Sequence, residues 1–237
     1  MKTQPERPLW AVVLVVCAAS CTRDADVAVD PERPDSSSPV RAADSIAEHP
    51  EELTDLWTRR AGVDWPDFLG PRRDGTSPEK GILTEWPAAG PRIVWQRELG
   101  GGYGIGSVSR GRFFQFDRLG NRARLICMHA ETGKTLWQFE YRSDYEDLYG
   151  YENGPRCSPV IDGNRVYIYG AEGWLHCLRA SDGELIWKCD TAGRFGVIQN
   201  FFGVGSTPVI DGELLIAVVG GSPAEDQNVP PRQLDRV

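Results

Sequence analysis

Within residues 65–219, short hydrophobic runs alternate with turns that are rich in Gly, Pro, Asn and Asp. The run Arg165–Tyr169 alternates in polarity, and the Asp162-Gly163-Asn164 turn before it is typical of a β-hairpin. Comparable turns separate the neighbouring runs. This stretch therefore predicts four antiparallel strands, at Ser158–Ile161, Arg165–Tyr169, Trp174–Arg179 and Glu184–Cys189.

The same pattern recurs along the chain. Leu125–Trp137 aligns with Leu175–Trp187 at an offset of 50 residues, and their apolar, Cys, Ala, Gly and Trp positions coincide. Ser158–Gly163 aligns with Thr207–Gly212 at an offset of 49 residues. Repeats of this length, each with several short strands, are typical of β-propellers. We therefore predict an all-β fold, a β-propeller of four-stranded antiparallel blades.

Each repeat places a glycine four residues before a tryptophan, as in Gly133 and Trp137 and again in Gly183 and Trp187. Glycine allows a positive φ at low cost, and a large ring on an outer strand can pack against the neighbouring blade. Trp95 occupies the same position in an earlier repeat whose first strands are missing. We expect all three tryptophans to be structural docking residues, and the Trp95 strand to complete a blade.

The N-terminal end predicts export. Two basic residues precede the apolar run Leu9–Ala19, which suits the core of a signal peptide over residues 1–21 and is too short for a membrane-spanning helix. Ala18–Cys21 resembles a bacterial lipobox, so Cys21 is a candidate lipidation site. The alternative is an ordinary secretory signal cleaved near Ser20. The expected location is the periplasm or the outer membrane, with the lipid at Cys21 as the membrane contact.

Composition changes after the leader. Residues 22–62 are acidic and rich in proline, which predicts a disordered tether before a folded part at residues 63–237. The whole chain has 26 basic and 34 acidic residues and a net charge of −8, so no basic field would attract nucleic acid. The 26 Gly, 17 Pro and 8 Trp favour short strands over long helices.

The segments Ala130–Trp137 and Ala180–Trp187 approximate the motif Ala-x-Asp-x-x-Thr-Gly-x-x-x-Trp, with shorter spacing. From about Trp65 onward the chain therefore resembles the pyrroloquinoline-quinone (PQQ)-type propeller repeat family. The opening Trp65–Pro78 is similar to the start of exported propeller proteins of planctomycete-like bacteria. Closed propellers have about four to eight blades. Residues 63–237 supply about three to four repeats, which predicts an incomplete ring, a C-terminally truncated fragment.

The resemblance implies two functional classes. One is a non-catalytic binding or scaffold propeller, similar in broad design to the propeller lipoprotein of the outer-membrane β-barrel assembly machinery. The other is a PQQ-dependent dehydrogenase acting on an alcohol or sugar, in which Glu, Asn and Asp oxygens would hold the quinone against calcium, often beside a disulfide of adjacent cysteines. We expect the first class, with no catalytic residue, no metal and no cofactor. PQQ with calcium belongs to the alternative.

The cysteines and histidines support this expectation. No two of the six cysteines are adjacent, although Cys157 and Cys189 could pair in an oxidising compartment. The histidines, His49, His129 and His176, do not have the spacing of metal ligands.

The loops before the inner strands are the candidate binding surface, because such loops gather on one face of a propeller. They comprise Tyr151–Arg156 and Ile198–Gly203, which mix acidic, amide, aromatic and glycine residues. The candidate ligand- or protein-binding residues are Glu152, Asn153, Arg156, Gln199 and Asn200. The alternative is that these side chains only hydrogen-bond the loops and fill the channel.

Overall fold

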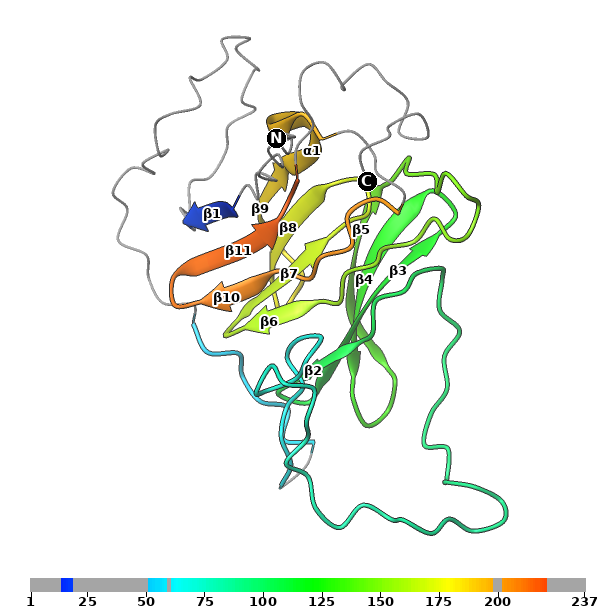
Figure 1. Ribbon diagram of the computed structural model, residues 1–237. Helices are drawn as coiled ribbons and strands as arrows, with labels where there is room; N and C mark the ends of the chain where they lie inside the picture. The colour runs from blue at the N-terminus through cyan, green and yellow to red at the C-terminus, as the bar shows by residue number, and fades with distance from the viewer. Residues whose placement is uncertain (1–13, 19–50, 59–60, 198–201, 221–237) are drawn as a thin grey trace, which may run out of the picture.

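The computed structural model describes residues 14–18, 51–58, 61–197 and 202–220, which form three antiparallel sheets and one short helix (Figure 1). The first sheet contains β2 (Ser107–Ser109), β3 (Arg112–Leu119), β4 (Arg122–His129) and β5 (Thr135–Arg142), in that order. The second contains β6 (Val160–Asp162), β7 (Arg165–Tyr169), β8 (Trp174–Arg179) and β9 (Leu185–Asp190). The third has the order β1 (Leu14–Ala18), β11 (Leu214–Val218), β10 (Val209–Asp211), and α1 is Thr191–Phe195. The predicted all-β fold of four-stranded antiparallel blades is confirmed.

The inner strand β6 begins two residues later than the sequence indicates. Pro159 has no N–H for a strand ladder, and its carbonyl accepts a hydrogen bond from Ser107 Oγ in the neighbouring sheet at 2.6 Å. Ser158 Oγ accepts the Ile105 N–H at 3.0 Å, and the Ser158 N–H donates to Thr207 Oγ1 at 3.4 Å. Small hydroxyl residues therefore join the inner strands of successive sheets.

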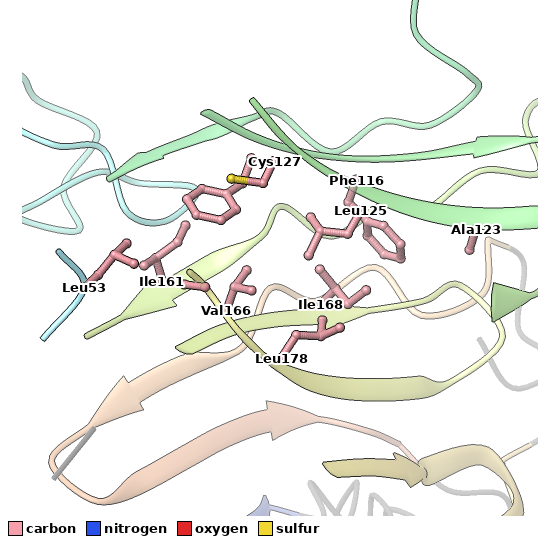
Figure 2. Close-up of a cluster of buried hydrophobic side chains, with 11 residues drawn as sticks. Leu53, Phe116, Ala123, Leu125, Cys127, Ile161, Val166, Ile168 and Leu178 are labelled. Carbon is pink, nitrogen blue, oxygen red and sulfur yellow. The ribbon is translucent and has the colours of Figure 1, made fainter. Parts of the chain in front are cut away.

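A large apolar cluster fills the space between the first two sheets. Figure 2 shows Phe116 and Leu125 of the first sheet facing Ile168 of the second. The whole cluster consists of Leu53, Phe114, Phe116, Ala123, Leu125, Cys127, Ile161, Val166, Ile168, Leu178 and Ala180. Because burial of apolar area stabilises a fold by about 25 cal/mol per Å², this contact is a principal source of stability.

Strand β7 contributes side chains to two hydrophobic clusters, one on each face of its sheet. Its Val166 and Ile168 belong to the first cluster, whereas Tyr167 and Tyr169 belong to a second cluster that includes Leu215 of β11. Successive side chains of a strand point to opposite faces. The alternation in the sequence therefore separates two buried faces, and it does not separate a buried face from a solvated one.

Tryptophans pack at the outer edge of the contacts between neighbouring sheets. Trp95 Nε1 donates to the Ala130 carbonyl at 2.8 Å, and Trp137 Nε1 donates to the Ala180 carbonyl at 3.0 Å. The Trp137 ring lies so close to Gly183 that a Cβ there would come within 2.5 Å of it. Trp187 packs beside the second cluster, and its buried Nε1 has no hydrogen-bond partner within the described residues.

Part of the segment expected to be a tether contacts the core. Leu53 is buried in the first cluster. The Leu56 N–H donates to the Arg110 carbonyl at 3.1 Å, and the Asn164 N–H donates to the Glu51 carbonyl at 2.7 Å. These hydrogen bonds connect the stretch 51–56 to the β2–β3 and β6–β7 turns.

Strand β1 lies inside the range predicted to be a signal peptide, and it pairs antiparallel with β11, Leu14 facing Val218. Among the described residues, no helix has the length and apolar character that crossing a membrane requires.

The Trp137–Gly183 contact generates a stability prediction. We expect Gly183→Ala to lower the free energy of unfolding by about 3 kcal/mol, because the new methyl group combines a strained positive φ with overpacking against Trp137. Gly120→Ala is the matched control, since Gly120 also has a positive φ but no atom within 4 Å of the added Cβ. Its cost should be about 1 kcal/mol. Urea titrations compare the two, and equal costs would contradict the docking contact.

Burial of His176 generates a second prediction. Its ring packs 4.4 Å from that of Tyr141, and burial, with Lys188 nearby, lowers the pKa of His176 from 6.5 to about 4. The unfolded chain therefore binds the proton more tightly. The free energy of unfolding should therefore be highest above pH 6.5. It should fall progressively towards pH 4, by up to about 3 kcal/mol. His176→Phe should flatten the unfolding profile measured between pH 7 and 4.5, whereas His129→Gln should leave it unchanged.

Candidate functional site

The segment 143–159 connects β5 to β6 and forms the centre of the candidate site. The loop lies at the end of the sheets where β5 ends and where the β7–β8 turn and α1 are found. Glu152, Asn153 and Arg156 are all in this loop, so the structure brings three of the predicted residues together. Gln199 and Asn200 lie outside the described residues, as does Cys21.

Asp147 organises the loop from inside. Its Oδ1 accepts the N–H groups of Tyr149 and Tyr151 at 2.9 and 3.2 Å, and its own N–H donates to Asn153 Oδ1 at 2.7 Å. Burial opposes ionisation of this carboxyl, but the two N–H donors and Arg156 hold the pKa of Asp147 below its ordinary value. One buried carboxylate therefore organises the loop through these hydrogen bonds and the ion pair.

Arg156 faces inward, towards Asp147. Its Nη2 lies 2.9 Å from Asp147 Oδ2 and 3.2 Å from the Tyr145 hydroxyl, and its Nη1 donates to the Gly154 carbonyl. The guanidinium also lies over the Tyr145 ring, 4.8 Å from the ring centroid. Burial raises the pKa of Tyr145 to about 12, against the opposing effect of Arg156. The contacts of this arginine are with groups of the loop itself, and its role in binding stays a prediction.

Glu152 and Asn153 are also engaged within the loop. Glu152 Oε1 accepts the N–H groups of Asn153 and Gly154 at 2.8 and 3.1 Å. The glycine-rich run 100–106 passes close beside them, and a Cβ on Gly101 would collide with the Glu152 carboxylate. The contacts of Glu152 and Asn153 are therefore hydrogen bonds within the loop. Their role in binding stays a prediction.

Three exposed aromatic side chains, which we call the aromatic trio, stand on these loops. Tyr149, Tyr151 and Phe202 are 46%, 69% and 52% exposed. Their ring centroids are 6.1 to 6.4 Å apart, so each ring contacts the other two. The sequence does contain the signal, since aromatic residues occur in both candidate loops, but sequence reasoning selected the polar neighbours instead.

A cavity of about 600 Å³ adjoins the trio. Gly203, the residue after Phe202, lines it and lies against the Tyr145 ring. Its lining includes the aromatic residues Tyr145 and Trp174, the carboxylates Asp144, Glu172 and Asp190, and the guanidinium of Arg142. Negative charge therefore exceeds positive charge around this cavity.

The carboxylates of the cavity have local partners. Glu172 Oε2 accepts a hydrogen bond from Ser143 Oγ at 2.9 Å, and Asp190 Oδ1 caps α1 by accepting the Gly193 N–H at 2.8 Å. Behind Glu172 lies Tyr141, whose pKa is raised well above its ordinary value by burial and by Glu172. Asp144 pairs with Arg142, and both side chains are about 70% exposed.

Part of this chain is similar to known proteins. Residues 122–229 match the family model described as outer membrane protein assembly factor BamB. That stretch resembles PQQ-like propeller repeats. The chain is 24% identical over 234 residues to the quinoprotein alcohol dehydrogenase PedH of Pseudomonas putida. The aligned region covers 93% of this chain and 33% of PedH. The chain thus spans about a third of the curated relative that it matches.

Two solved structures resemble the PQQ-like repeats more distantly. The quinohemoprotein alcohol dehydrogenase of Comamonas testosteroni is 17% identical, with a TM-score of 0.46, over 67% of this chain and 23% of that protein. BamB of Moraxella catarrhalis is 15% identical, with a TM-score of 0.31, over 53% of this chain and 34% of BamB.

PQQ-like repeats raise the question whether the described residues suit a quinone held by calcium. Within the described ranges, no three His, Cys, Asp or Glu side chains form a group that could hold a metal ion. The buried carboxylates of Asp117 and Asp147 are bound by Arg124 and Arg156. Cys157 is a buried thiol, so the pair with Cys189 is not formed. The two buried carboxylates are thus engaged within the fold, and binding of PQQ with calcium stays a prediction of the alternative.

The buried Arg156–Asp147 pair generates a prediction. Arg156→Ala leaves the Asp147 carboxylate buried without its cation, so thermal unfolding should occur at a Tm lower by roughly 6–12 °C. Arg142→Ala is the matched control, because it breaks an exposed ion pair and should lower Tm by less than about 2 °C. Equal effects in differential scanning calorimetry would show that Arg156 does not brace the loop.

Proposed function

We propose that this chain is a non-catalytic binding platform within an exported propeller protein, and that its partner is a protein. The observation that carries the proposal is the aromatic trio, two of whose members stand on the loop that Asp147 organises. Aromatic residues are enriched at the centres of protein interfaces, and a surface held in one conformation loses little entropy on binding. Tyr149 and Tyr151 meet both conditions, because Asp147 fixes their backbone and leaves their rings exposed.

The polar contacts of the loop support the same function. Arg118 Nη1 donates to the carbonyls of Tyr145 and Asn153, at 2.5 and 2.9 Å, and Arg156 is engaged with Asp147. These groups hold the shape of the surface. Glu152, Asn153 and Arg156 would then contribute to binding indirectly, by positioning the trio.

Export and lipid attachment at Cys21 are part of this proposal. The apolar run that ends before Cys21 supports a signal peptide, and the relation to an outer-membrane assembly factor supports an envelope location. The competing proposal is a PQQ-dependent dehydrogenase, which the similarity to PedH favours. The PQQ-like repeat family contains both kinds of protein, so a direct experiment has to separate them.

Photo-crosslinking tests the binding platform. A benzoylphenylalanine placed at Tyr151 should crosslink to a protein when the full chain is expressed in its own host. The same group at Leu136 should not, because Leu136 is also exposed but lies at the other end of β5. Immunoblotting of irradiated cells would detect the difference as a shifted band.

Two results would contradict the proposal. One is equal crosslinking at the two positions, which would indicate non-specific encounters. The other is saturable dye reduction by an alcohol or a sugar after PQQ and calcium are added to the purified full chain. That activity would favour the dehydrogenase.

A further inference from the structure

We propose that the aromatic trio and the adjoining cavity bind a basic polypeptide segment, with one arginine or lysine side chain in the cavity and neighbouring residues across the trio. This inference deepens the proposed function and rests on it. It specifies the chemistry of the partner from shape, aromatic character and charge.

Shape comes first. A volume of about 600 Å³ lies within the range of sites that enclose part of a ligand. The cavity begins directly beside the trio, because Phe202 and Gly203 are consecutive and Gly203 contacts Tyr145. A continuous segment can therefore place one side chain in the cavity while its neighbours contact Tyr149 and Tyr151.

Charge selects a cation. Among the described residues, three of the four charged side chains that line the cavity are carboxylates, and the fourth, Arg142, pairs with Asp144 at the rim. The nearby guanidinium groups of Arg118 and Arg156 are directed to the loop carbonyls and to Asp147. A basic side chain would therefore meet a lining with more carboxylates than cations, even with Lys188 over the Trp174 ring, whereas an acidic side chain would be repelled.

Aromatic character favours the same occupant. Tyr145 and Trp174 line the cavity, and cations bind the faces of such rings. Within the described residues a cation already lies over each of these two rings, Lys188 at 5.1 Å from the Trp174 centroid and Arg156 at 4.8 Å from that of Tyr145. A planar guanidinium can stack on a ring and hydrogen-bond a carboxylate at the same time.

Peptide binding to the purified full chain tests this inference. The probe is a fluorescently labelled Ser-Leu-Arg-Leu-Arg-Leu-Ser peptide, and its control carries citrulline, which is neutral and of the same shape, in place of both arginines. In fluorescence anisotropy titrations, the citrulline peptide should bind at least about tenfold more weakly. Glu172→Gln and Tyr151→Ser should each weaken the arginine peptide by about three- to tenfold.

Matched variants at the other end of β5 provide the control for general charge and hydrophobicity. Glu131→Gln and Leu136→Ser remove an exposed carboxylate and an exposed apolar side chain there, and should leave the affinity unchanged. Equal binding of both peptides, or equal effects of all four variants, would overturn the inference. So would a dimer in light scattering that Tyr151→Ser dissociates, because the occupant would then be a second copy of this chain.

The outcomes separate this inference from the proposed function. If a protein crosslinks at Tyr151 but the arginine peptide does not bind, the platform stands and the basic segment is rejected. If neither the crosslink nor the peptide complex forms, both are rejected.

Discussion

Burial of both faces of the β6–β9 sheet is the constraint on which the rest of the structure depends. A sheet of four short strands has too little area to form a core alone, so it needs a neighbour on each side. Val166 and Ile168 contact one neighbour, and Tyr167 and Tyr169 contact the other. The contacts that fix the distance between the sheets therefore maintain this burial. They include the hydroxyl hydrogen bonds of the inner strands and the Trp137–Gly183 contact at the outer edge.

The stacked sheets determine what the connecting loops can do. A long connection such as 143–159 must leave one sheet and enter the next, and its backbone groups need partners where it is buried. Asp147, Asn153, Arg118 and Arg156 supply those partners. Much of their hydrogen-bonding capacity is consequently used inside the loop, and the exposed residues of the loop include the aromatic Tyr149 and Tyr151.

Much of the fold could be predicted from the sequence, because a repeat shows twice where strands and turns occur. The β7 and β8 strands match their predicted bounds, and β6 and β9 differ by two residues or fewer at each end. The site could not be predicted to the same degree. Whether Glu152 faces a ligand or its own backbone depends on the fold of the whole loop, and a local pattern carries no such information. The core position of Leu53 escaped prediction for a similar reason, since its contacts lie far along the chain.

The direction of the arginine side chains connects the fold to the recognition that we propose for the loop surface. Each buried arginine near the loop neutralises or hydrogen-bonds a group that the fold itself needs, as Arg124 does for Asp117 and Arg156 for Asp147. Positive charge is thereby withdrawn from the loop surface, while Glu172 and Asp190 remain at the cavity. The same interactions that organise the 143–159 loop thus leave exposed aromatic rings beside a cavity with acidic side chains. A surface of this kind discriminates by charge as well as by shape, because a basic partner gains attraction and an acidic one loses solvation without compensation.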